Sequence, residues 1–273
     1  MQHREIAFIG AGNMAHAIIA GLVSHGYPAS KITVCSPTPV RRDKIAEQYG
    51  INSTNDNVAA VKQADVIVLA VKPQMMKEVC EALQQATDFS EKLVLTIAAG
   101  IPAHRYNTYF GQELRLIRIM PNTPSLVGKG VSGLFAQDTV SEQDKQFAQE
   151  LMQSVGSTIW CVKEQEINNV IAITGSSPAY FFLFMEAMQQ KAEQLGYDEK
   201  QARELVLNAI DGSVALAKSQ GDIAFSTLRE QVTSKGGTTA MALEQFYNGN
   251  LPQTVAQAMQ SAIDRAEEME KLF

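Results

Sequence analysis

A glycine turn stands between an apolar run and a helical stretch near the start of the sequence. The run Ile6–Ile9 is followed by Gly10, Gly12 and Ala15 in the pattern G-x-G-x-x-A. In such a turn the first glycine permits a tight bend, the second lets the backbone approach a pyrophosphate, and the small third residue lets the helix pack closely. The helix N-terminus also attracts phosphate charge. We therefore expect a dinucleotide site here, the alternative being a purely structural turn.

Short apolar runs alternate with helical stretches as far as residue 162. Because these runs are rich in β-branched residues, we expect them to be buried parallel strands. The alternation predicts a doubly wound α/β domain of the Rossmann type at residues 1–162. The expected strands are Ile6–Ile9, Ile32–Cys35, Val66–Val71, Leu93–Ala98 and Leu116–Met120, completed by Gly130–Phe135 and Ser157–Val162; the expected helices are Asn13–His25, Val40–Tyr49, Met75–Gln85 and Ala103–Tyr109.

Helical periodicity alone continues from residue 163 to residue 273, which predicts an all-helical second domain. Within it, Tyr180–Met188 is apolar on every face, so we expect it to be buried inside the domain or against another subunit. A membrane span is the competing interpretation, but Gly175, Pro178 and Glu186 interrupt the apolar run. The expected helices are Glu164–Thr174, Pro178–Leu195, Lys200–Ser219, Thr238–Phe246 and Leu251–Leu272.

Composition narrows the class of protein. The formal net charge is −6 and its charges are scattered, so neither nucleic acid nor an anionic membrane is expected as a partner. The three cysteines are far apart and no H-E-x-x-H pair occurs, so we expect no metal. An N-terminal signal peptide is the alternative to a strand, but Gly10, Gly12, Asn13 and His16 interrupt its apolar core, and we expect a cytoplasmic protein.

The residues after the second expected strand bear on cofactor choice. A chain selective for NAD usually places a carboxylate there for the ribose hydroxyls, but this one continues with Ser36, Thr38, Arg41 and Arg42. Hydroxyls together with Arg41 or Arg42 could hold a 2′-phosphate through charge-assisted hydrogen bonds. These residues favour NADPH, with NADH possible; an ordinary solvated helix start is the alternative.

Two further strand tips lie where open sheets bind ligands, beyond the carboxyl ends of the strands. Small residues there would let a flat nicotinamide ring approach the backbone, although close helix packing also explains Ala98 and Ala99. The two tips read Ala70-Val71-Lys72-Pro73 and Ala98-Ala99-Gly100.

Five motifs in register carry a family resemblance. They are Gly10-Ala11-Gly12-Asn13-Met14, Ala70-Val71-Lys72-Pro73, Met120-Pro121-Asn122-Thr123-Pro124, Gly175-Ser176-Ser177-Pro178-Ala179-Tyr180 and Gly236-Gly237-Thr238-Thr239. Together they closely resemble pyrroline-5-carboxylate reductase. The resemblance implies hydride transfer from NAD(P)H to the C=N carbon of 1-pyrroline-5-carboxylate, giving L-proline in the last step of proline biosynthesis. It also implies an obligate homodimer of interleaved C-terminal helices, sometimes assembled into a higher oligomer.

The resemblance further implies roles for individual residues. Ser234, Gly237 and Thr238 would bind the substrate carboxylate, and the Thr239 hydroxyl would reach the ring nitrogen as the catalytic group; a threonine N-cap is the alternative. Glu164 would lie near that nitrogen, or would simply favour a helix start. The expected cofactor contacts are Gly10, Ala11, Gly12, Asn13, Met14, Ser36, Arg41, Asn57 (or a helix cap), Ala70, Val71, Lys72, Pro73, Ala98, Ala99, Gly100 and Asn122.

One position departs from the pattern of the family. Lys235 stands where the family usually has proline, so the loop loses a rigid φ constraint and gains a charge.

A β-hydroxyacid dehydrogenase or general imine reductase would share the two-domain layout, but the former needs a catalytic lysine that Glu164–Thr174 lacks. A regulatory protein that senses NADPH without turnover is the alternative from another class.

Overall fold

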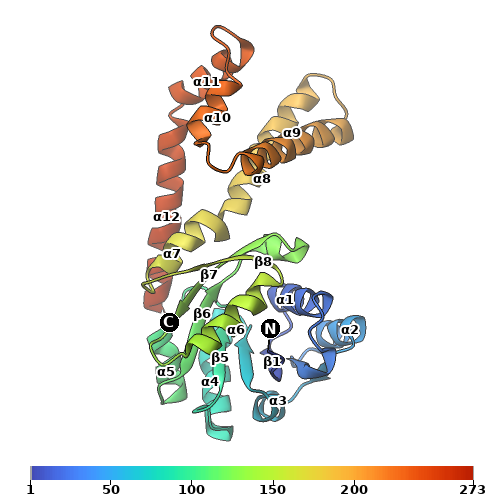
Figure 1. Cartoon of the computed structure of the whole chain (residues 1–273), viewed down its shortest axis with the longest axis vertical. Helices are drawn as coiled ribbons and strands as arrows, with labels where there is room; N and C mark the ends of the chain where they lie inside the picture. Colours follow the sequence, from blue (N-terminus) through green and yellow to red (C-terminus); the bar gives the residue numbers. More distant parts are fainter. Residues whose placement is uncertain (1, 273) are drawn as a thin grey trace. The chain divides into compact units, whose positions relative to one another are not determined.

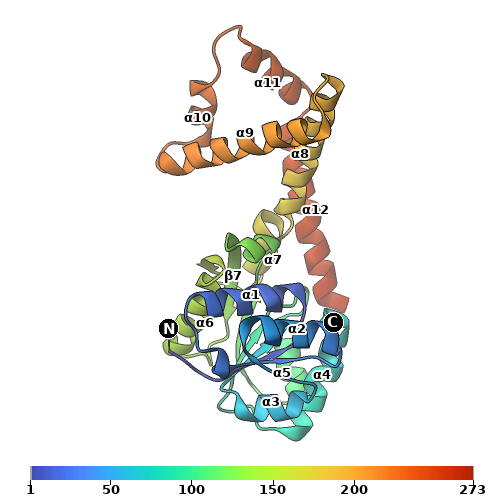
Figure 2. The same cartoon turned by 90° about the vertical axis from the view of Figure 1, so that its right-hand side faces the viewer.

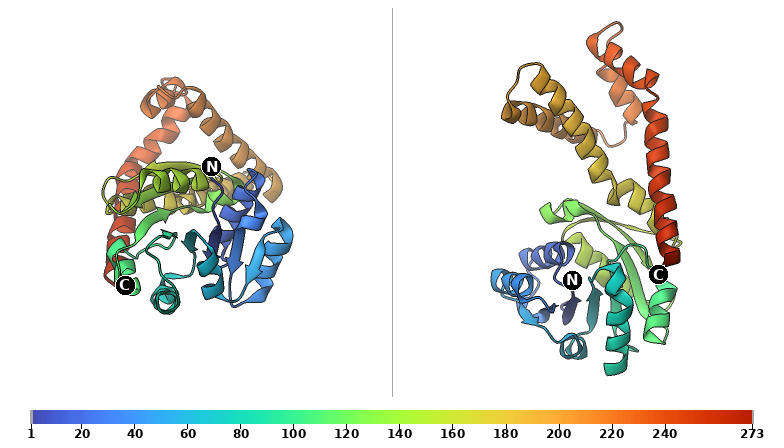
Figure 3. Two further views of the ribbon diagram at one scale, coloured as in Figure 1. Left: turned by 60° about the horizontal axis from the view of Figure 1, so that its bottom comes forward. Right: turned by 180° about the vertical axis from the view of Figure 1, so that it is seen from behind.

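The structure is a computed structural model that describes residues 2–272 (Figure 1). The chain divides into two compact units, one formed by Met1–Ser176 with Ala262–Phe273 and the other by Ser177–Ser261. The last turns of the chain therefore return to the first unit (Figure 3). The expected functional boundary at residue 162 stays a prediction.

An eight-stranded sheet forms the first unit, in the order β3-β2-β1-β4-β5-β6-β7-β8. Every neighbouring pair is parallel except β6 with β7. The strand order reverses between β1 and β4, which is the switch point of a doubly wound sheet, so the predicted fold class is confirmed. The strands are β1 (Ile6–Ile9), β2 (Ile32–Cys35), β3 (Asn52–Thr54), β4 (Val66–Leu69), β5 (Leu93–Thr96), β6 (Arg115–Met120), β7 (Gly130–Ala136) and β8 (Gly156–Trp160).

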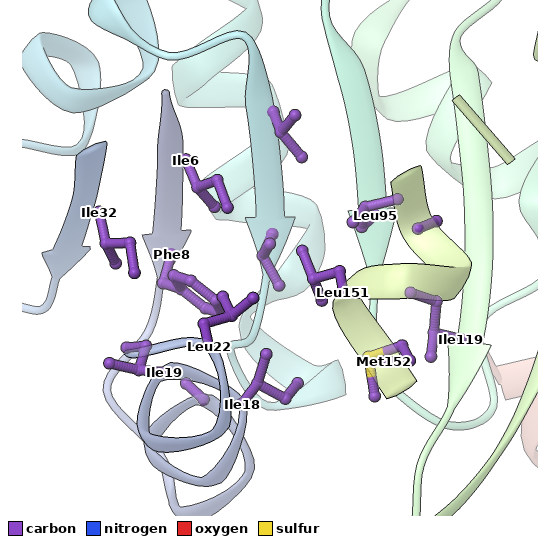
Figure 4. Packing of buried hydrophobic residues seen from close by; sticks show 14 of the residues in the cluster. Ile6, Phe8, Ile18, Ile19, Leu22, Ile32, Leu95, Ile119, Leu151 and Met152 are labelled. Atoms are coloured by element: carbon purple, nitrogen blue, oxygen red, sulfur yellow. The ribbon is translucent and has the colours of Figure 1, made fainter. Parts of the chain in front are cut away.

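Helices cover both faces of the sheet because successive strand side chains point to opposite sides. In β1, Ile6 and Phe8 join one core cluster, whereas Ala7 and Ile9 join the other. The first cluster is closed by α1 (Asn13–Ser24), α2 (Pro39–Tyr49) and α6 (Glu142–Gln153), whose Leu22, Leu151 and Met152 pack beside Phe8 and its neighbours in Figure 4. The second cluster is closed by α3 (Asn57–Gln63), α4 (Pro73–Ala86) and α5 (Ala103–Phe110).

Several elements differ from the sequence-based expectation. Strands β4 and β5 end at Leu69 and Thr96, two residues earlier than predicted, because the chain leaves the sheet there. The predicted elements did not include β3, α3, α6 or α10 (Phe225–Gln231). Strand β3 is polar and largely exposed, and the seven-residue helices α3 and α10 are too short to show a clear period. Helix α6 did carry a signal, since Phe147, Ala148, Leu151 and Met152 form its buried face.

Helices make up the second unit, and Figure 2 shows them in yellow to red. Helix α7 (Glu166–Val170) and a π-helical turn at Ile171–Gly175 lead into α8 (Ser177–Gln194). Helix α9 (Glu199–Ser219) begins at a capping box formed by Asp198 and Gln201. The chain then continues through α10, α11 (Thr238–Asn248) and α12 (Leu251–Leu272).

Helix α8 is apolar, yet none of its residues is buried within the single chain. Phe181, Phe182 and Leu183 are more than 60% exposed. The continuous helical stretch Glu166–Gln194 has a mean hydropathy of 1.3 and is, by length and composition alone, sufficient to cross a membrane. Burial inside its own unit, one of the two expectations for Tyr180–Met188, is therefore wrong, and α8 needs a partner outside the chain to cover its apolar face.

A buried arginine holds two distant parts of the chain in the first unit. Arg118 lies on β6 with a side chain only 3% exposed. Its Nη1 donates to Glu164 Oε1 at 2.5 Å and to Glu270 Oε1 at 3.2 Å. Glu164 precedes α7 and Glu270 lies in the last turns of α12, so one guanidinium binds the chain both before it enters the second unit and after it returns. A charge this deeply buried depends on those carboxylates.

We expect Arg118→Met to lower the free energy of unfolding by roughly 3 kcal/mol, because it leaves two partly buried carboxylates without their counter-charge. Arg115→Met is the matched control on the same strand, since Arg115 pairs with Glu91, whose side chain is 84% exposed. This surface pair contributes about 1 kcal/mol or less. Urea denaturation of both variants measures the difference. Equal losses would show that the Arg118 cluster is not a major contributor.

Candidate active site

The glycine turn lies at the switch point between β1 and β4. Gly10 has a φ of +117°, and a Cβ placed on it would lie 2.5 Å from the carbonyl oxygen of Ala70. The Gly10 N–H also donates to the Cys35 carbonyl at 2.8 Å. Both the left-handed conformation and the close approach of two strand tips therefore require glycine at this position.

The second glycine has a different reason to be there. Gly12 has a φ of −76°, caps α1 without a side chain, and a Cβ on it would meet no protein atom within 4 Å. Packing within the protein therefore does not explain the absence of a side chain. The first-turn N–H groups of α1 begin at Asn13 and have no acceptor within the helix. A free helix N-terminus with open space above it is a place for a phosphate.

The turn after β2 carries no strand-end carboxylate. Cys35 ends the strand, and burial raises the pKa of its thiol to about 12, so the group is neutral. Ser36 follows, and its Oγ accepts a hydrogen bond from the Thr38 N–H at 3.3 Å. Arg41 is exposed in the first turn of α2. The structure thus places an uncharged strand end and a nearby arginine where an adenosine ribose would lie.

The remaining expected cofactor residues gather at the same edge of the sheet. Ile9 pairs in register with both Cys35 and Leu69, and Leu69 pairs with Thr96, so the segments after these strands are neighbours. Those segments contain Ala70, Val71, Lys72 and Pro73, and then Ala98, Ala99 and Gly100.

Asn57 is the first residue of α3, but it does not cap the helix. The cap is Asp56, whose carboxylate accepts a hydrogen bond from the Ala59 N–H. The helix-cap alternative for Asn57 is therefore wrong. The Cys35 Sγ contacts the Asp56 carbonyl at 3.7 Å, so Asn57 lies close to the end of β2 and remains a candidate for the ribose.

The side chain of Asn122 forms hydrogen bonds within the fold. Its side chain is buried, with Oδ1 accepting from the Val131 N–H at 2.8 Å and Nδ2 donating to the Thr174 carbonyl at 2.9 Å. These bonds attach the end of β6 to β7 and to the π-helical turn. The amide thus positions the backbone of this turn, and a contact between Asn122 and the cofactor stays a prediction.

Glu164 is also held by hydrogen bonds within the fold. Its Oε1 accepts hydrogen bonds from Arg118 and from the Ala103 N–H at the start of α5, the latter at 2.6 Å. The structure thus gives this carboxylate a structural partner, and a role of Glu164 near the substrate nitrogen stays a prediction. The sequence could not reveal this partner, because Arg118 lies 46 residues away.

The loop expected to bind substrate lies in the second unit and ends at a helix start. Gly236 has a φ of +71°, and Gly237 is the N-cap of α11 with no side-chain cap bond. The threonine N-cap alternative is therefore wrong. Thr238 and Thr239 are exposed in the first turn, and within residues 2–272 their hydroxyls form no hydrogen bond. A Cβ on Gly237 would lie 2.4 Å from Ser234 Oγ, so this glycine lets the loop fold tightly.

Comparisons with known proteins cover the whole chain. Residues 164–269 match the family model described as pyrroline-5-carboxylate reductase dimerisation, and residues 5–100 match one described as NADP oxidoreductase, coenzyme F420-dependent. The pyrroline-5-carboxylate reductase of Vibrio alginolyticus is 55% identical over 273 residues, which is 100% of both chains.

Two solved structures share the fold over nearly their full length. A pyrroline-5-carboxylate reductase from Coxiella burnetii has a TM-score of 0.91 and 39% identity, covering 98% of this chain and 99% of that one. Plasmodium falciparum pyrroline carboxylate reductase with NADP bound has a TM-score of 0.89 and 26% identity, covering 99% of each.

The dimerisation match explains the exposed apolar helix. It includes all of α8, whose exposed apolar face is consistent with pairing between two copies of the chain. The region 164–269 is accordingly a dimerisation region and the protein a homodimer. With the glycine turn, the Gly237 helix start and the full-length match in one sequence, the chain belongs to the pyrroline-5-carboxylate reductase family.

Proposed function

We propose that this protein reduces 1-pyrroline-5-carboxylate to L-proline with NADPH, the last step of proline biosynthesis. The observation that carries the proposal is the start of α11, where a glycine cap leaves N–H groups and two threonine hydroxyls available. These groups match a small carboxylate next to an imine nitrogen. Membership of the family supports the same substrate.

The cofactor proposal rests on the edge of the sheet. The α1 N-terminus and the space above Gly12 suit the pyrophosphate, and Gly10, Ala11, Asn13 and Met14 complete that turn. Asn57 and Ser36 suit the adenosine ribose, and Arg41 suits its 2′-phosphate. The tips at Ala70–Pro73 and Ala98–Gly100 suit the nicotinamide half. NADH lacks the 2′-phosphate and would bind the same edge more weakly.

The chemistry asked of the protein is mainly positioning. When bound, NADPH supplies the hydride that goes to the imine carbon. The N–H groups of Thr238 and Thr239 at the helix start, with the Ser234 hydroxyl, hold the substrate carboxylate, whereas the Gly237 N–H donates to the Ser234 carbonyl at 3.0 Å and shapes the loop. The Thr239 hydroxyl hydrogen-bonds the ring nitrogen, and a proton taken up from solvent at that nitrogen balances the hydride and completes the product amine. Because the carboxylate and the nitrogen are both fixed by one helix start, the imine carbon takes a single orientation.

The same proposal covers organisation and location. We propose functional domains at residues 1–162 and 163–273, and a soluble cytoplasmic enzyme whose homodimers can assemble further. Its partner is a small-molecule substrate, with no nucleic acid or membrane involved. Support comes from the dimerisation match across α8, which gives the apolar helix a protein partner.

We expect Gly12→Ala to weaken NADPH binding by at least about tenfold, roughly 1.4 kcal/mol, while leaving thermal stability nearly unchanged. The added methyl group meets no protein atom but occupies the space above the helix start. Gly10→Ala is the matched variant. It should instead lower stability by about 1–3 kcal/mol, because the backbone is left-handed and the Ala70 carbonyl is in the way. Fluorescence titration and thermal unfolding separate the two effects; a Gly12→Ala variant that binds NADPH normally would contradict the assignment.

We expect Thr239→Ala to lower kcat/KM for pyrroline-5-carboxylate by about 100-fold, because the ring nitrogen loses its hydrogen bond. NADPH binding should be preserved, since the loop lies in the other compact unit. Thr239→Ser retains a hydroxyl and should recover most of the activity. Steady-state kinetics with both substrates measures this, and an unchanged kcat/KM in Thr239→Ala would overturn the assignment.

A further inference from the structure

The first two turns of α2 carry three cationic side chains, those of Arg41, Arg42 and Lys44. One of them, Arg42, has partners within the fold. Arg42 Nη1 donates to the Ser36 carbonyl at 3.0 Å, and Nε donates to Asp43 Oδ1 at 2.7 Å. Its side chain is only 14% exposed. The same guanidinium holds the pKa of the Asp43 carboxyl below its usual range. Arg42 is therefore committed to the turn between β2 and α2.

Arg41 and Lys44 are the other two, and they share a cavity with the glycine turn. Being three residues apart on a helix, they lie on one face. They line a cavity of about 170 Å³ together with Ala11, Gly12 and Asn13 of the glycine turn. Within residues 2–272, neither side chain forms a hydrogen bond or an ion pair. Two positive charges without a partner among the described residues thus lie in the first two turns of α2, the helix that begins just after Ser36, which we propose contacts the ribose.

Acidic groups near this cavity do not cancel these charges. Asp43 is neutralised by Arg42, and Asp56 caps α3. Glu47 lies three residues after Lys44 but makes no ion pair among the described residues. His16 also lines the cavity, and its Nε2 is within 3.0 Å of the Tyr49 hydroxyl, which fixes its ring against α2. The cavity is therefore electropositive and suited to an anion.

We propose that Lys44 is a specificity-determining residue that binds the cofactor's 2′-phosphate together with Arg41, while Arg42 is a positioning residue that holds the turn. The inference rests on the proposed use of NADPH. Sequence alone left Arg41 and Arg42 equivalent and did not single out Lys44. A phosphate between a guanidinium and an ammonium gains charge-assisted hydrogen bonds from both.

Two nucleotides that differ only in the 2′-phosphate test the proposal. Isothermal titration of the intact dimer with adenosine 2′,5′-bisphosphate and with adenosine 5′-monophosphate measures binding independently of turnover. Lys44→Ala should weaken the bisphosphate about tenfold and leave the monophosphate within twofold; Lys44→Arg should restore binding. Lys62→Ala, which removes an exposed charge on α3, is the matched control and should change neither.

The Arg42→Ala variant tests whether Arg42 holds the turn in position or contacts the 2′-phosphate directly. If Arg42 holds the turn, its loss should weaken both nucleotides by a similar factor. A loss of affinity confined to the bisphosphate would make Arg42 a direct phosphate ligand and overturn its assignment as a positioning residue. A bisphosphate affinity unchanged in Lys44→Ala but reduced in Arg41→Ala would overturn the role of Lys44 while leaving NADPH use intact. A wild-type protein that binds both nucleotides equally would instead contradict the proposed NADPH preference itself.

Discussion

The close approach of the Gly10 turn to the Ala70 carbonyl is the constraint on which the cofactor half of the structure depends. A side chain at Gly10 would lie 2.5 Å from that oxygen, so the tips of β1 and β4 can meet only around a glycine. Because these strands flank the switch point, their meeting aims the start of α1 across the edge of the sheet. Gly12 then leaves the first-turn N–H groups open. Packing within the protein requires Gly10, whereas the space above Gly12 is open, as our proposal of a bound pyrophosphate requires.

The helical region depends on a different interaction. A buried guanidinium, Arg118, attaches the chain to the sheet at Glu164 and again at Glu270, and the residues between form a unit whose first long helix has no buried side chain. Such a helix is incomplete in one chain and complete in a dimer, as the dimerisation match indicates. The loop that we propose binds the substrate lies inside this same region. Our proposal therefore assigns dimerisation and substrate binding to one stretch of sequence.

The sequence pattern predicted those elements that depend on interactions between residues close together in the chain. The parallel strands β1, β2, β4, β5 and β6 and the turn after β1 were predictable because apolar β-branched runs and a glycine motif are short-range signals. The polar edge strand β3 and the roles of Glu164 and Asn122 were not, since the first lacks an apolar period and the others depend on partners far along the chain. Arg118 meets Glu270 across 152 residues, which no periodicity records. The choice between Arg41 and Arg42 likewise required knowing that Asp43 and the Ser36 carbonyl already hold Arg42.

We propose that the protein performs imine reduction, with a dinucleotide-binding edge in one unit and a glycine-capped helix start in the other. Following the oxidation of NADPH by the purified protein, with pyrroline-5-carboxylate and separately with a small β-hydroxyacid's oxidised form, tests it most directly. We expect rapid oxidation with the imine, slower oxidation when NADH replaces NADPH, and none with the keto acid. No imine-dependent oxidation with either cofactor would contradict the proposal.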